Sequence, residues 1–117
     1  MFLTMMKTVR TKAETTPICR HFLWAAGIVG QRWVPQIVRS LEAGPSRFGE
    51  IRDGIPQLSD HLLSQRLKAM EEDGIVERRV TPSTPVRIEY RLSKSGRELA
   101  RVFAELGAWA ERWADAG

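Results

Sequence analysis

Apolar side chains change their spacing twice between residues 59 and 113, and this pattern limits the folds that the chain can adopt. They recur at helical steps from Ser59 to Glu72, alternate with polar residues from Ile75 to Leu92, and return to helical steps up to Trp113. Steps of three and four mark one face of a helix, whereas alternation marks a strand. The sequence therefore predicts a helix, a two-stranded hairpin with its turn at residues 82–85, and a long last helix.

Three further helices are predicted before this part of the chain. The first, Ile18–Val29, follows Pro17 and is apolar on almost every side, which predicts burial on more than one face. In so small a chain, a partner subunit is expected to cover the second face. Gly30 separates this helix from an amphipathic one over 33–41, and a short helix over 48–53 ends at Gly54. The predicted fold class is mainly α with one small β-hairpin.

The length and charge of the chain indicate one domain with a basic arm. The 117 residues are enough for one hydrophobic core, which we assign to residues 17–117. Residues 1–16 show no sustained period and are expected to form a flexible arm. The net charge is +4, but residues 46–91 carry eight basic and eight acidic side chains. Any binding of nucleic acid by the middle of the chain must therefore depend on individual placed residues.

Several classes of protein are excluded by what the sequence lacks. One cysteine and two histidines leave no internal disulfide, no zinc site and little material for a catalytic triad. We therefore expect no metal, no cofactor and a cytoplasmic location. No apolar run is long enough to span a membrane. The chain has no Gly-rich phosphate loop, nucleophile elbow or paired catalytic carboxylates, so we do not expect an enzyme.

The predicted elements have the order of a helix-turn-helix followed by a wing. A turn at residues 54–58 lets the next helix, capped by Ser59, project from the domain. Leu63, Leu67 and Met70 face the core, which leaves polar side chains on the opposite face. Such side chains read base edges in the major groove. They are Ser59, Asp60, His61, Ser64, Gln65 and Lys68, and the hairpin adds Arg78, Arg79 and Arg87.

These residues also resemble a known family. The resemblance is carried by Trp33 and by the runs Arg47–Ile51, Leu63–Leu67, Asp73–Val76 and Pro85–Leu92, in this order and spacing. Together they are similar to the HxlR-type winged helix-turn-helix regulators, relatives of the MarR group, over about residues 19–110. The resemblance implies a homodimeric bacterial transcriptional regulator that binds double-stranded DNA. It also implies that the first and last helices build the dimer.

The resemblance implies where DNA and a second subunit would bind. The recognition helix, about Ser59–Glu72, would enter the major groove of an inverted-repeat operator. The wing, about Ile75–Leu92, would lie on the flanking backbone or in the minor groove. Arg47, Ser83 and Thr84 join the expected wing and flank contacts, while Arg66 either clamps phosphate or pairs with Glu77 or a neighbouring acid. The expected dimer residues are Phe22, Trp24, Ile28, Phe103, Leu106, Trp109 and Trp113.

Three alternatives stay open at this point. Cys19 is either a redox switch at the start of a helix or a buried cysteine that acts as a small hydrophobe. Because Arg20 follows it where the family usually has proline, the buried interpretation is favoured. The four tryptophans either line a pocket for an unknown small-molecule effector or belong to the core and interface. Finally, a winged helix can serve protein–protein assembly without binding specific DNA.

Overall fold

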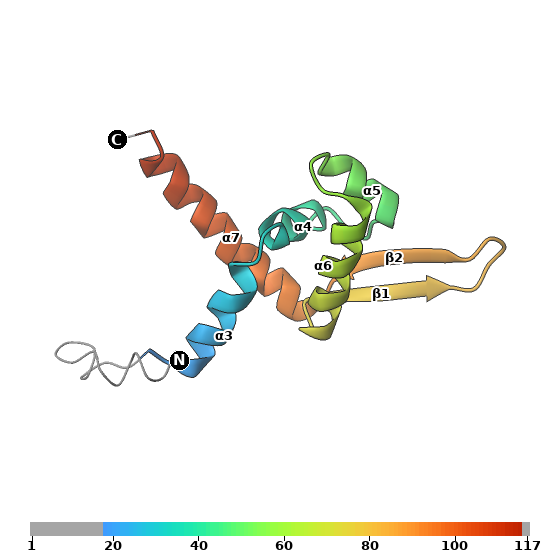
Figure 1. The fold of residues 1–117 in the computed structure, drawn as a ribbon, viewed down its shortest axis with the longest axis horizontal. Helices are drawn as coiled ribbons and strands as arrows, with labels where there is room; N and C mark the ends of the chain where they lie inside the picture. The colour runs from blue at the N-terminus through green and yellow to red at the C-terminus, as the bar shows by residue number, and fades with distance from the viewer. Residues whose placement is uncertain (1–17, 116–117) are drawn as a thin grey trace. The chain divides into compact units, whose positions relative to one another are not determined.

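The computed structural model describes residues 18–115, and the predicted basic arm lies outside them. The helices are α3 (Arg20–Val29), α4 (Val34–Ser40), α5 (Phe48–Gly54), α6 (Asp60–Glu72) and α7 (Lys94–Trp113), and the strands β1 (Val76–Thr81) and β2 (Arg87–Leu92) form one antiparallel hairpin (Figure 1). The chain is therefore mainly helical with a small hairpin, as the sequence predicts. It divides into two units between Gln31 and Arg32, and the first contains α3.

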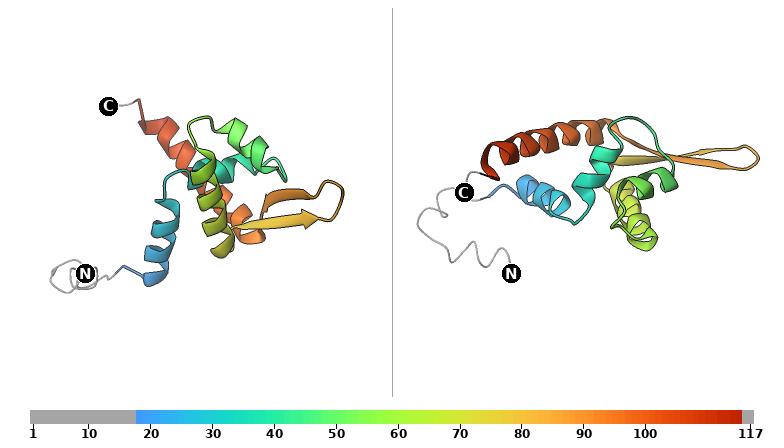
Figure 2. Two further views of the ribbon diagram at one scale, coloured as in Figure 1. Left: turned by 45° about the vertical axis from the view of Figure 1, so that its right-hand side comes forward. Right: turned by 90° about the horizontal axis from the view of Figure 1, so that it is seen from above.

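The second unit has its core where α4, α6 and the base of the hairpin meet. Seen from above, α4 lies between α7 on one side and α5 and α6 on the other (Figure 2). The apolar face of α4 is fully buried, as the amphipathic spacing predicts. The buried side chains of this unit are Val34, Ile37, Val38, Leu41, Ile51, Ile55, Leu58, Leu63, Leu67, Met70, Ile75, Val76, Leu92, Ala100 and Phe103.

Two helices begin later than the sequence suggests. The first was expected to run from Ile18, but Cys19 has extended backbone angles, so it caps a helix that starts at Arg20. The Cys19 sulfur accepts the backbone N–H of His21 at 3.3 Å. Trp33 was expected within the second helix, but it precedes α4 with a φ of 78°. Pro35 stands in the first turn of α4, where its missing N–H costs little.

Helix α6 has clear stop and start signals. The hydroxyl of Ser59 accepts the backbone N–H of Leu62 at 3.1 Å, which confirms the predicted cap. At the other end, Gly74 takes a left-handed φ of 78°, and the N–H of Ile75 donates to the Met70 carbonyl at 2.9 Å. This turn leads directly into β1.

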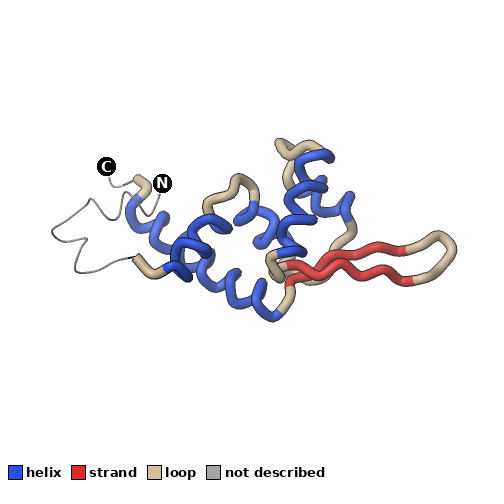
Figure 3. The backbone as a smooth tube through the Cα atoms, turned by 60° about the horizontal axis from the view of Figure 1, so that its bottom comes forward, coloured by secondary structure: helices blue, strands red, loops and turns tan. Residues whose placement is uncertain are grey.

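The hairpin projects past the helices of its unit (Figure 3). Its register pairs Glu77 with Arg91 and Arg79 with Glu89 on one face, whereas Arg78 lies opposite Tyr90 on the other. Arg91 donates to Glu77 at 2.8 Å, and this hydrogen bond holds the pKa of Glu77 below its usual value. At the base, the backbone of Ser46 exchanges two hydrogen bonds with Tyr90. The base is therefore held by a third segment, while the tip extends freely.

The start of α7 is locked to the end of α6. The hydroxyl of Ser93 caps α7 by accepting the N–H of Gly96 at 3.0 Å, and it donates to the Gly74 carbonyl at 2.6 Å. The Ser93 N–H donates to the Ile75 carbonyl at 2.9 Å. A Cβ at Gly96 would collide with that same carbonyl oxygen. The close approach of α7 to this turn therefore requires glycine at residue 96.

Candidate nucleic-acid interface

One face of α6 is apolar and buried, and the opposite face is polar and exposed. Leu63, Leu67 and Met70 have 1% or less of their surface exposed, so they fix α6 in the core. The structure leaves all six of the predicted polar residues exposed on this helix or at its cap. They are Ser59, Asp60, His61, Ser64, Gln65 and Lys68. The face offers hydroxyl, amide, imidazole, carboxylate and ammonium groups, which are the hydrogen-bonding groups that can contact base edges.

One charged residue next to this face, Arg52, was not predicted from the sequence. Arg52, in the last turn of α5, reaches Asp60 in the first turn of α6 at 3.4 Å and also contacts Asp53 at 3.4 Å. All three side chains are well exposed, so the ion pairs themselves add little stability. The contact depends on the angle between the two helices, which the sequence does not reveal. It places a cation beside Asp60, at the start of the exposed face of α6.

Of the two interpretations of Arg66, pairing with Glu77 or a neighbouring acid is not met within the described residues. The Arg66 side chain instead donates from Nε to the backbone carbonyl of Arg32 at 2.9 Å. Glu77 pairs with Arg91 at 2.8 Å across the hairpin, because strand register places these two directly opposite each other. The remaining nitrogens of Arg66 keep the other interpretation, contact with phosphate, open.

The predicted wing and flank residues are all exposed. Arg78 and Arg79 point to opposite faces of β1, and Arg87 starts β2 next to the tip that holds Ser83 and Thr84. These therefore lie on the projecting hairpin, away from the buried base. Arg47 caps α5, and its backbone N–H donates to the Glu50 carboxylate at 2.7 Å. Its side chain is exposed.

Helix α7 carries an apolar stripe that the described chain leaves uncovered. Leu106, Trp109 and Trp113 are 54%, 56% and 61% exposed, and Val102 continues the same stripe. On α3, Phe22 and Trp24 are also exposed. Two other residues expected at a dimer interface, Phe103 and Ile28, are only 6% and 8% exposed, so little of their surface remains for a partner. Phe103 belongs to the core of its own unit.

Cys19 is exposed in the described chain, so the expectation that it is buried is not met. It caps α3 instead of packing within it, since its backbone is extended. The imidazole Nδ1 of His21 lies 3.7 Å from the sulfur. The thiol is therefore accessible and has a polar neighbour.

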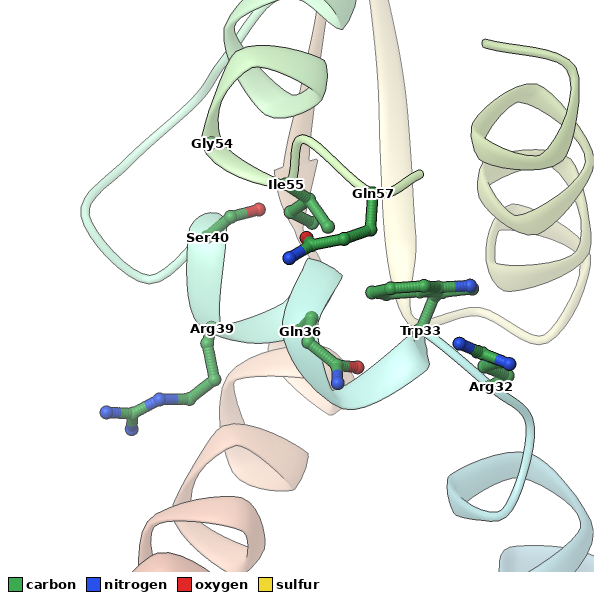
Figure 4. Close-up of a pocket in the computed structure, with 8 residues that line it drawn as sticks. All are labelled: Arg32, Trp33, Gln36, Arg39, Ser40, Gly54, Ile55 and Gln57. Atoms are coloured by element: carbon green, nitrogen blue, oxygen red, sulfur yellow. The ribbon is translucent and has the colours of Figure 1, made fainter. Parts of the chain in front are cut away.

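A hollow of about 780 Å³ opens beside the start of α4 (Figure 4). It is lined by Arg32, Trp33, Gln36, Arg39, Ser40, Gly54, Ile55 and Gln57. Trp33 is half-buried there, but Trp24, Trp109 and Trp113 are exposed on α3 and α7. The interpretation of the tryptophans as core residues therefore fails for these three. Exposure is what an interface between subunits would require of them.

The part of the chain that the structure describes contains neither a metal-site cluster nor a membrane-spanning helix. Between residues 18 and 115, no cluster of three or more histidine, cysteine and acidic side chains has the arrangement of a metal site. Within the same range, no helix combines the length and apolar character needed to cross a membrane.

Known proteins resemble this chain along most of its length. A model described as HxlR-like helix-turn-helix matches residues 28–117. The uncharacterised HTH-type transcriptional regulator YvaP of Bacillus subtilis (strain 168) is 46% identical over 98 residues, which cover 84% of this chain and 91% of YvaP. The reduced form of the B. subtilis transcriptional regulator YodB superposes with a TM-score of 0.79 at 41% identity, over 86% of this chain and 98% of YodB. The redox regulator HypR in its reduced form superposes with a TM-score of 0.76 at 28% identity, over 81% of this chain and 94% of HypR.

Proposed function

The chain belongs to the HxlR-like helix-turn-helix family, and from this premise we propose that it binds specific double-stranded DNA as a homodimer. In this proposal α6 enters the major groove, and the hairpin lies on the flanking backbone or in the minor groove. Two copies related by two-fold symmetry bind the two halves of an inverted repeat.

The family and the named relatives are transcriptional regulators, so the chain is a regulator of the HxlR and MarR-like type and not an enzyme. The winged helix-turn-helix fold that the sequence predicts is confirmed by the same comparisons. The identity of the DNA sites, the dimer and the residues that make contact belong to the proposal.

The observation that carries the proposal is the division of α6 into two faces. Three apolar side chains hold the helix rigidly in the core, and six exposed polar groups line the face that points away from it. A helix that served only to pack against protein would gain little from a face of this kind, since unpaired polar groups are costly to bury. Ser59 and Asp60 already have partners in Leu62 and Arg52. Base edges and phosphates would supply partners for the side chains of His61, Ser64, Gln65 and Lys68.

The test is selection of bound sequences from a random pool of duplex DNA by the whole protein. We expect an inverted repeat whose half-site centres lie about one helical turn, or a small multiple of it, apart. Recovery of asymmetric single half-sites would count against the dimeric arrangement. Recovery of no sequence at all would favour the alternative, a winged helix that assembles proteins only.

We expect Gln65 to determine sequence preference and the wing arginines to determine affinity. Glutamine can bind adenine through two hydrogen bonds, and a good base contact is worth roughly 1–3 kcal/mol of discrimination. Gln65→Ala should therefore bind the selected operator more weakly than the wild type does. It should bind an operator altered at the base pair that Gln65 contacts almost as well as it binds the selected operator. Arg78→Ala should bind every operator variant more weakly than the wild type does, and by about the same factor, because a phosphate contact carries no sequence information.

The measurement is the affinity of both variants for a panel of operators with single base-pair changes. Arg79→Ala is a useful comparison, because Arg79 faces Glu89 across the hairpin and part of its charge is already compensated. Equal loss by Gln65→Ala on every operator would show that Gln65 does not read a base.

The proposed dimer is built from exposed apolar residues on α3 and α7. Phe22, Trp24, Leu106, Trp109 and Trp113 would otherwise remain in water, at about 25 cal/mol for each Å² of apolar surface. Monomeric soluble proteins rarely keep large apolar patches of this kind exposed. A second copy offers the same side chains in the same arrangement, which is what a two-fold interface needs.

A response to thiol-reactive compounds is a second candidate function. It is favoured by the exposed sulfur of Cys19 at the start of α3, one of the proposed dimer helices. HypR is described as a redox regulator, and YodB has been solved in diamide-treated and quinone-bound forms. With one cysteine per chain, oxidation would join two subunits or add a small thiol.

We expect Cys19 to modulate DNA binding at most. Cys19→Ser should bind the operator as tightly as the wild type under reducing conditions, because Cys19 caps α3 and lies outside the proposed DNA-contacting elements. Operator affinity is measured for both proteins with reductant and after treatment with diamide. Equal affinity in all four samples would leave Cys19 with a structural role. A loss on oxidation that reductant reverses, and that Cys19→Ser lacks, would make this protein a thiol-based sensor.

A further inference from the structure

Arg32 is a cation that the structure positions without giving it an anion. Its guanidinium lies 4.9 Å from the centre of the Trp33 indole ring, and Figure 4 shows the two side chains stacked at one edge of the hollow. The attraction between a guanidinium and an aromatic face restrains the arginine. Ion pairs are present at Arg39, Arg52 and Arg91, but within residues 18–115 no carboxylate pairs with Arg32.

The backbone around Arg32 is fixed as firmly as its side chain. Arg66 on α6 donates from Nε to the Arg32 carbonyl at 2.9 Å, so the segment before α4 is tied to the recognition helix. Trp33 holds a φ of 78°, a conformation that bulky residues rarely adopt and that persists only where the surroundings impose it. Residues held in this way are concentrated at functional sites. Arg32 and α6 therefore form one positioned unit.

Arg32 lies just before α4, on the side of α6 away from the hairpin, where a cation could contact the second DNA backbone. The hairpin extends from one side of α6, and α4 lies toward the other side (Figure 1). The hairpin arginines lie on the hairpin side of α6. A helix in the major groove is bordered by two backbones, and contacts with both fix its depth and register. The amides of Gln36 and Gln57, which line the same hollow as Arg32, add hydrogen-bond donors there.

We propose that Arg32, stacked on Trp33 and tied to α6 through Arg66, binds a phosphate of the DNA backbone on the side of α6 opposite the hairpin. This inference rests on the proposed binding of duplex DNA. A guanidinium can donate two parallel hydrogen bonds to one phosphate, and stacking reduces the freedom that it loses on binding. Since residues 46–91 have no net charge, a few such placed cations must supply the attraction to DNA.

The experiment measures the affinity of Arg32→Ala for the selected operator at several salt concentrations. Binding should weaken about tenfold, and the slope of log affinity against log salt should become shallower by about one per subunit. The loss should be the same on operators with altered bases. Arg39→Ala is the matched control, because Arg39 lines the same hollow but points away from Trp33 and pairs with Glu42 at 3.3 Å. It should bind like the wild type.

Two additional variants keep the test decisive. Arg32→Lys retains the charge and should keep the wild-type salt slope, with an affinity between those of wild type and Arg32→Ala. Arg32→Gln keeps a polar side chain and serves if Arg32→Ala does not fold, and it should show the same shallower slope. Thermal unfolding of every variant at one protein concentration checks the fold.

Several results would overturn the inference. One is wild-type affinity and an unchanged salt slope for Arg32→Ala, with the wild type binding its operator normally, which leaves the proposed function intact. Another is a loss that depends on the altered base, which would make Arg32 a base contact. A third is an Arg32-dependent rise in melting temperature with inorganic phosphate at constant ionic strength, without an effect on DNA affinity, which would indicate a site for a free anion. Failure of the wild type to bind any duplex would instead remove the proposed function itself.

Discussion

Trp109→Asp is expected to convert the protein from a dimer to a monomer at micromolar concentration. The indole is 56% exposed in the single chain and lies in the middle of the apolar stripe on α7. In the proposed dimer this stripe is desolvated, and an unpaired carboxylate there is strongly unfavourable. Loss of a central aromatic contact costs about 3 kcal/mol, which raises the dimer dissociation constant about a hundredfold.

Sedimentation of wild type and variant over a range of concentrations provides the measurement. Ala104→Asp is the matched control, because Ala104 is exposed on the same helix about half a turn round from the stripe, at about 3.6 residues per turn. It introduces the same charge and should remain dimeric. A wild type that sediments as a monomer at micromolar concentration would refute the dimer, and equal dissociation by both variants would refute the choice of stripe.

Gly96→Ala is expected to lower the free energy of unfolding by about 3 kcal/mol, the upper end of the usual cost of overpacking. The added methyl group would collide with the carbonyl oxygen of Ile75, which is backbone and already accepts a hydrogen bond from Ser93. Backbone at this turn cannot shift without disturbing the end of α6 or the start of β1. The strain therefore cannot be relieved by a change of rotamer.

Gly107→Ala, on the same helix, is expected to raise the free energy of unfolding instead. Apart from the adjoining backbone of α7 and the two neighbouring residues, no atom lies within 4 Å of a Cβ at Gly107. The substitution should therefore stabilise the helix by about 0.5–1 kcal/mol, because alanine has a higher helix propensity than glycine. Denaturant unfolding of both variants at one protein concentration distinguishes them. A stability of Gly96→Ala within 0.5 kcal/mol of wild type would contradict the close approach of α7 to this turn.

Local signals in the sequence predicted most of the fold. Ser59 and Ser93 were identified as helix caps because their hydroxyls are short acceptors at the start of apolar periods, and both caps are present. The hairpin was evident from the alternation of residues 75–92, with strand ends differing by one residue. These features depend on neighbours along the chain, so the sequence is enough to predict them.

Features that depend on distant backbone could not be predicted in this way. Arg66 finds its partner in the carbonyl of Arg32, 34 residues earlier, and a carbonyl leaves no mark in the sequence. Trp33 fits the apolar period of α4, yet its left-handed φ places it before the helix. Phe103 and Trp109 look alike in the periodic pattern of α7, but packing against its own unit buries only the first.

The dependence of operator affinity on salt tests the central claim most directly. If α6 and the hairpin bind duplex DNA, log affinity should fall linearly with log salt, with a slope of about −4 or steeper for a dimer that contacts five or more phosphates. The selected operator should also be preferred over random duplex by a factor of about 10³ or more. A flat slope with no detectable binding of any duplex at low salt would contradict the account and leave a winged helix that assembles proteins.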